Sequence, residues 1–143
     1  MGLFNFFKRD KTSERSHLKA LMEMAMADGE MDKFEYEYLL SISKKLGISQ
    51  DELEKLKDSH EHLDFKAPSS KRESFRQLYE LICMMMIDGE IHNKEMRMCG
   101  VFAKKLGFAE KYIEELVLSV KQNVTMGNSE EETLKRVSFI LNQ

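Results

Sequence analysis

Apolar residues recur along most of the chain at the three- and four-residue spacing of a helix with one buried face. The clearest run predicts a helix over about residues 13–28 and consists of Leu18, Leu21, Met22, Ala25 and Met26. Residues 81–87 are apolar on every side, which predicts a central helix that is buried all round. No stretch alternates apolar and polar residues over the length of a strand. The pattern therefore predicts an all-α protein.

Glycines and capping residues divide this pattern into helices. Gly29 and Gly47 each follow an apolar run, where a residue without a Cβ ends a helix easily. Asp32 and Glu35 have the spacing of a capping box that opens the next helix. With the same reading applied throughout, seven helices are predicted, and they begin near residues 13, 32, 49, 70, 92, 109 and 129.

An internal repeat organises these helices. Residues 18–56 and 78–116 align without a gap at an offset of 60, and 14 of the 39 paired positions are identical. A unit of this length holds two or three helices and has to bury its apolar face against the other copy. We therefore predict a seven-helix bundle built from two tandem copies of a helix–Asp-Gly-Glu–helix unit. It forms a single domain over residues 13–143, preceded by an aromatic and basic tail over residues 1–12.

Composition narrows the class of protein. The net charge of −3 has interleaved signs, without the basic footprint of a nucleic-acid binder, so no nucleic-acid partner is expected. No apolar run is long enough to span a membrane, and the N-terminus lacks the features of a signal peptide, so we expect a cytoplasmic protein. Cys83 and Cys99 lie in apolar stretches at a spacing that fits neither a zinc site nor a small disulfide scaffold, which predicts buried free thiols.

The two Asp-Gly-Glu turns are the strongest candidates for a site. Asp28 and Asp88 each sit at the predicted C-terminal end of a helix, where the helix dipole disfavours an anion. A divalent cation held by these residues and by Glu30 and Glu90 would explain the placement, and oxygen ligands favour Ca²⁺ or Mg²⁺. The other interpretation is that the turns are only helix connections, with the next helix N-terminus compensating the charge. The turn at Asp32 is the stronger candidate, because the second copy has His92 there, with Asn93 beside it as the better cap.

Other residues give weaker signals. Eleven methionines are explained by core packing, with Cu(I) ligation as the alternative, whereas Met24 and its counterpart Met84 leave the predicted core face and suggest a partner surface. No known catalytic motif is present, so we expect no enzyme activity. The tail residues Phe4, Phe6 and Phe7 either fold back onto the bundle or make peripheral contact with a membrane.

The doubled motif resembles the tellurite-resistance TerB-like family. The residues that carry the resemblance are Met26-Ala27-Asp28-Gly29-Glu30 and Met86-Ile87-Asp88-Gly89-Glu90, each followed by a glutamate five residues later. The resemblance implies a duplicated seven-helix bundle with an acidic metal-binding surface and participation in stress-response complexes. Transferred by position, it implies a metal site formed by Asp28, Glu30, Glu35, Asp88, Glu90 and Glu95.

From the sequence we therefore expect a non-enzymatic binding module in which the acidic turns bind a divalent cation and other surfaces contact protein partners. The alternative is a structural or scaffolding bundle without a metal site. The sequence leaves the metal, the partners and the oligomeric state open.

Overall fold

The computed structural model describes residues 11–27, 29–59, 65–87, 89 and 91–142. Within these residues the protein has seven helices and no strand, which confirms the all-α prediction. The helices are α2 (Thr12–Ala25), α3 (Lys33–Lys45), α4 (Gln50–Asp58), α5 (Lys71–Met85), α6 (Asn93–Lys105), α7 (Glu110–Thr125) and α8 (Glu130–Leu141).

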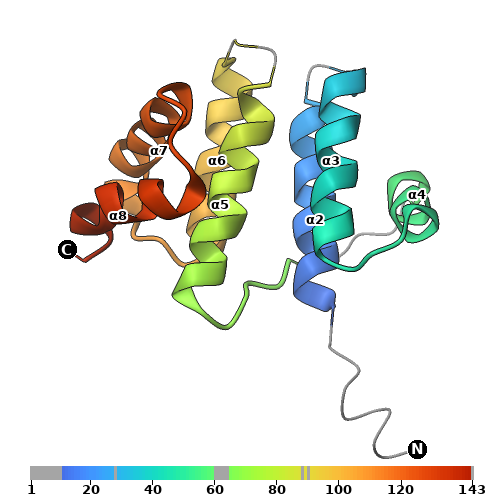
Figure 1. Ribbon diagram of the computed structural model, residues 1–143, viewed down its shortest axis with the longest axis horizontal. Coiled ribbons are helices and arrows are strands. Elements are labelled where there is room, and N and C mark those ends of the chain that lie inside the picture. Colours follow the sequence, from blue (N-terminus) through green and yellow to red (C-terminus); the bar gives the residue numbers. More distant parts are fainter. Residues whose placement is uncertain (1–10, 28, 60–64, 88, 90, 143) are drawn as a thin grey trace, which may run out of the picture.

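Four long helices form the centre of the bundle, and the other three lie at its two sides. Helices α2, α3, α5 and α6 run along one another, with α4 beside α3 and with α7 and α8 on the opposite side (Figure 1). Helix α2 packs against α3, α4, α5 and α6, and α5 packs against α2, α6, α7 and α8. Helix α5 therefore has a central position, as predicted, but it ends at Met85, and Cys83, Met86 and Ile87 are half-buried rather than buried. No helix in the described part of the chain is long and apolar enough to cross a membrane.

The predicted capping residues set most helix boundaries. Ser49, Ser70 and Ser129 each accept a hydrogen bond from the backbone N–H three residues later, which satisfies one orphan donor at the start of α4, α5 and α8. The first helix ends earlier than predicted, at Ala25 rather than near residue 28. Met26 already has the backbone geometry of a helix cap, so the turn begins there.

Helix ends recur at an interval of 60 residues. Helices α2 and α5 end at Ala25 and Met85, and α3 and α6 span Lys33–Lys45 and Asn93–Lys105. The glycines that follow these helices have positive φ in both halves: Gly29 and Gly89 before the second helix of each half, and Gly47 and Gly107 after it. A tandem origin of the two units stays a prediction, but the two halves place their helix ends alike.

One prediction about the surface is wrong. Met24 and Met84 are buried, with 2% and 1% of their surface exposed, so they do not form a partner surface. His17 lies two turns before Met24 on α2 and is hydrogen-bonded to Glu80 on α5. The face of α2 that was predicted to contact a partner protein is therefore part of the α2–α5 interface. Helix α2 packs against other helices on more than one side, so this face is buried as well.

Candidate functional site

The two Asp-Gly-Glu turns lie at the same end of the bundle. The α2–α3 and α5–α6 connections both appear at the top of Figure 1. In the first turn the Gly29 N–H donates to the Met26 carbonyl at 2.9 Å, and in the second the Gly89 N–H donates to the Met86 carbonyl at 3.0 Å. Both glycines have positive φ, 108° and 80°, a conformation that residues with a Cβ rarely adopt. The described parts of the two turns thus share this hydrogen bond and a glycine with positive φ. Asp28, Asp88 and Glu90 lie outside the described residues.

In the first turn, the capping box that the sequence predicts is complete. The Glu35 N–H donates to Asp32 Oδ1 at 2.8 Å, and the Asp32 N–H donates back to Glu35 Oε1 at 3.0 Å. Glu35, a predicted metal ligand, therefore already stabilises the N-terminus of α3 through one carboxylate oxygen. Glu30 is exposed on the turn. Of the three predicted first-turn ligands, the structure places Glu30 toward solvent and Glu35 at the helix cap.

In the second turn, the side chains differ although the backbone is alike. His92 is the N-cap of α6 and makes no capping hydrogen bond with its side chain. Asn93, predicted to be the better cap, is instead the first residue of the helix, so that prediction is wrong. Glu95 is 7% exposed, and its Oε1 lies 3.9 Å from Nε2 of His92. The counterpart of Glu35 is therefore more buried and faces a histidine rather than an aspartate cap.

No group of three or more His, Cys, Asp or Glu side chains in the described residues is arranged to hold a metal ion. Glu30, Glu35 and Glu95 therefore do not form a complete ligand set without the turn residues outside the description. The predicted metal site as a whole stays a prediction.

A buried polar cluster joins the two halves at the α2–α5 interface. His17 Nε2 lies 2.8 Å from Glu80 Oε1, and the exposed Lys45 approaches Glu80 Oε2 at 3.4 Å. His17 and Glu80 are 1% and 3% exposed, and both line a cavity of about 520 Å³ between α2, α5 and the segment before α5. Removal of either member of such a buried pair leaves the other without its partner, and this destabilises the interface.

Sequence reasoning missed this cluster, because 63 residues separate His17 from Glu80 and no local spacing connects them. A usable signal existed nonetheless. His17 lies three and seven residues before Ala20 and Met24, and Glu80 lies four residues before Met84, so each polar residue shares a helix face with apolar residues. A hydrogen bond between two helices requires a donor side chain on the buried face of one helix and an acceptor side chain on the buried face of the other.

The thiols provide no nucleophile for catalysis. Cys99 is buried and Cys83 half-buried, and both are free, as predicted. Burial raises the pKa of Cys99 to about 12. It is also the main cause that raises the pKa of Cys83 to about 11, although hydrogen bonds from Tyr38 and Tyr79 oppose the shift. Because the thiolate is the reactive form, both groups are inert at neutral pH.

Comparison with known families gives one match. Residues 5–58 match the family model described as Tellurite resistance protein TerB. This segment contains α2, α3, α4 and the whole first Asp-Gly-Glu turn. No curated protein and no solved structure matches the chain.

Proposed function

The chain is TerB-like over residues 5–58, and we propose that it is a non-enzymatic binding module whose acidic turns bind a divalent cation. The observation that carries the proposal is the placement of both Asp-Gly-Glu connections at one end of the bundle (Figure 1). Carboxylates from two turns at one end can complete a shell of six to eight oxygens that a single short turn does not supply. Water molecules provide the remaining ligands.

The proposed ligands are the carboxylates of the two turns. Oxygen-only coordination favours Ca²⁺ or Mg²⁺ over softer metals. In the first turn the ligands are Asp28 and Glu30, with Glu35 contributing the oxygen that does not accept the capping hydrogen bond. In the second turn the corresponding ligands are Asp88, Glu90 and Glu95. We expect them to bind the cation more weakly, because His92 replaces an acidic neighbour.

Exposed apolar side chains next to the first turn support a role in binding protein partners. Met26, at the end of α2, is 46% exposed, and Phe34, in the first turn of α3, is 68% exposed. In the second half the corresponding residues are Met86, which is half-buried, and Lys94. We propose that Met26 and Phe34 contact a protein partner beside the cation, in a cellular role of the tellurite-resistance or stress-response type, in the cytoplasm. Peripheral membrane contact through Phe4, Phe6 and Phe7 stays a prediction, because these residues lie outside the description.

A scaffolding bundle without a metal is the second candidate, and the capping box favours it. Asp32 and Glu35 satisfy two backbone donors of α3, which accounts for both acids without any cation. The two candidates predict different responses to calcium.

Thermal unfolding with 5 mM Ca²⁺ and with chelator tests the proposal, because an ion that binds only the folded state raises its stability. We expect a gain on the order of 1 kcal/mol for a Kd of about 10⁻⁴–10⁻³ M. The gain should shrink in Asp28→Asn and Glu30→Gln and persist in Glu37→Gln, an exposed α3 acid outside the turn that serves as the matched control. Identical curves with calcium and chelator would favour the scaffold.

A further inference from the structure

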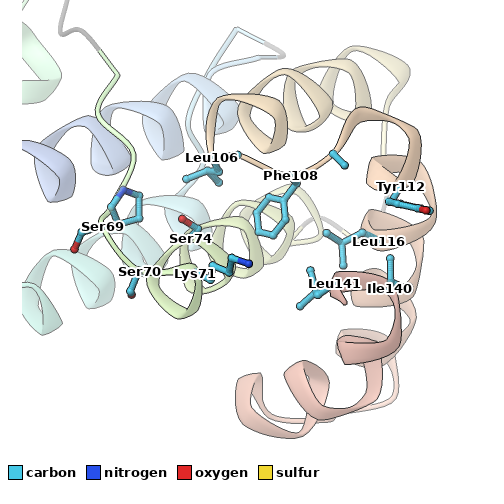
Figure 2. Close-up of a pocket in the computed structure, with 13 residues that line it drawn as sticks. Ser69, Ser70, Lys71, Ser74, Leu106, Phe108, Tyr112, Leu116, Ile140 and Leu141 are labelled. Carbon is cyan, nitrogen blue, oxygen red and sulfur yellow. The ribbon is translucent and has the colours of Figure 1, made fainter. Parts of the chain in front are cut away.

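A second cavity lies at the opposite end of α5 from the acidic turns. Its volume is about 430 Å³, within the range of small-molecule sites. The start of α5 forms one wall, the α6–α7 turn and α7 form another, and the end of α8 closes it. Figure 2 shows the Phe108 ring between Ser74 and Lys71 on one side and Leu116, Ile140 and Leu141 on the other.

The one charged side chain of this cavity and a buried hydroxyl are on the same wall. Lys71 is the single charged residue among those that line it, and its ammonium group makes no hydrogen bond or ion pair with the described part of the chain. Ser74 is 7% exposed, lines the cavity, and has a hydroxyl without a hydrogen-bond partner among the same residues. Both belong to the first turn of the 15-residue helix α5, whose N-terminus carries partial positive charge. This wall therefore attracts an anion.

Away from the start of α5, the lining is mostly apolar, with Tyr112 on α7 as the exception. Leu106, Leu116 and Ile140 are 5%, 2% and 2% exposed, and Phe108 and Leu141 are half-buried beside them. No acidic side chain lines the cavity, so nothing there opposes a bound anion or pairs with Lys71. The cavity thus combines one unpaired cation with an aliphatic and aromatic interior.

In the first half, the lysine at the corresponding position has a hydrogen-bond partner within the chain. Lys11, which lies 60 residues before Lys71, donates from Nζ to the Gly47 carbonyl at 2.7 Å. Gly107, the counterpart of Gly47, instead lines the cavity together with Lys71. Ser74 also replaces an acid, Glu14. Within the described residues, Lys71 therefore has neither the backbone partner that Lys11 has nor a carboxylate at the position of Glu14.

We propose that this cavity binds a small amphiphilic carboxylate, with the carboxylate at Lys71, Ser74 and the N-terminus of α5 and with a single apolar tail against Phe108, Leu116 and Ile140. The carboxylate complements the unpaired ammonium with a charge-assisted hydrogen bond and accepts a further bond from the Ser74 hydroxyl. The tail covers the exposed parts of Phe108 and Leu141, which are half-buried. This site is separate from the acidic turns and requires no metal.

Titration with decanoate tests the proposal, with binding followed by NMR of the Leu and Ile methyl groups. We expect saturable shifts at Leu106, Leu116 and Ile140. Lys71→Gln should weaken binding about tenfold, because it removes a charge-assisted hydrogen bond, and Ser74→Ala should weaken it less. Lys11→Gln is the matched control and should bind decanoate like the parent protein. Lys71 is exposed, so its variant is expected to fold, and a thermal melt checks this.

Two ligands with the same ten-carbon tail separate the carboxylate from simple apolar binding. The neutral 1-decanol should bind at least about tenfold more weakly than decanoate, and decylammonium should produce no saturable shift at these methyl groups, because it repels Lys71. Equal affinity for decanoate and 1-decanol, unchanged affinity in Lys71→Gln, or shifts confined to other methyl groups would overturn the proposal.

Discussion

The two halves of this protein place their first two helices alike along the chain, but they carry different side chains at the turns between these helices. The first helices of the two halves end at positions 60 residues apart, and so do the second helices. In each half a turn whose glycine has positive φ joins the two helices. At the first turn, Asp32 and Glu35 form a complete capping box, whereas His92 caps α6 without a side-chain hydrogen bond. The scaffold therefore depends on the glycine and the apolar pattern, while the polar residues around the turn are free to take different roles.

At the opposite end of the bundle, corresponding residues of the two halves also have different roles. Lys11 is bonded to the Gly47 carbonyl, and its counterpart Lys71 faces a cavity. A lysine that is hydrogen-bonded to the backbone in one half thus lines a cavity in the other, where we propose that it binds a ligand. In our proposals, the first half contributes the stronger of the two acidic turns to the cation site, and the second half contains the cavity for an amphiphilic ligand.

The largest expected effect concerns the pair that holds the halves together. Glu80→Ala removes the partner of the buried His17 and should destabilise the protein by about 3 kcal/mol, measured by urea unfolding at pH 7. Glu80→Gln should lose less, because the amide oxygen still accepts from the imidazole. Glu52→Ala, which breaks an exposed pair with Arg15, should cost less than about 1 kcal/mol. A Glu80→Ala protein as stable as the Glu52→Ala control would show that the halves do not depend on this pair.

Alkaline pH should destabilise the protein through the second half. Cys83 and Cys99 both lie there, at positions that Glu23 and Leu39 occupy in the first half. Their pKa values are raised to about 11 and about 12, so the unfolded chain, with thiol pKa values of about 8.5–9, loses these protons first. Stability is therefore fully present below about pH 8 and falls as pH rises, by about 3 kcal/mol between pH 8 and pH 10 for the two thiols together.

Urea unfolding at the two pH values measures this loss. The double variant Cys83→Ser, Cys99→Ala provides the control, because it should be less stable at pH 8 yet lose most of the pH dependence. A parent protein with equal stability at pH 8 and pH 10, or a double variant with the same slope as the parent, would contradict the assignment to the thiols.

The caps give a smaller and more direct contrast between the halves. Asp32→Ala should cost about 1 kcal/mol, because it leaves the Glu35 N–H without its acceptor. His92→Ala should be nearly neutral, since the His92 side chain caps nothing. Urea unfolding of the two variants side by side checks the difference, and equal losses would mean that the two helix starts are energetically alike.

Most of the fold was predictable because it depends on local signals. Helical spacing, Ser and Asp caps and Gly stops act within a few residues, and they place seven helices with ends close to the observed ones. The errors arise where local signals compete. Asn93 is a good cap residue, but His92 occupies the cap position, so the helix starts one residue earlier than a cap at Asn93 would place it. Met24 lies outside the main apolar face of its helix, yet it is buried in a second helix interface.

The candidate sites were less predictable because they depend on distant residues. The capping box was visible as a four-residue motif, but the His17–Glu80 pair and the cavity at Lys71 each join segments far apart in the chain. Lys71 becomes noticeable only when Lys11 is seen to bond Gly47. The acidic ligands themselves stay predictions, because Asp28, Asp88 and Glu90 lie outside the described residues.

We propose that the two turns are unequal sites although their glycines have similar geometry, with the cation bound chiefly at the first turn. An NMR-monitored Ca²⁺ titration tests it directly through the backbone amides of Gly29 and Gly89, which occupy the same position in the two turns. We expect Gly29 to shift saturably with a Kd of about 10⁻⁴–10⁻³ M and Gly89 to shift less. The absence of any calcium-dependent shift at Gly29, or a larger shift at Gly89, would contradict the account.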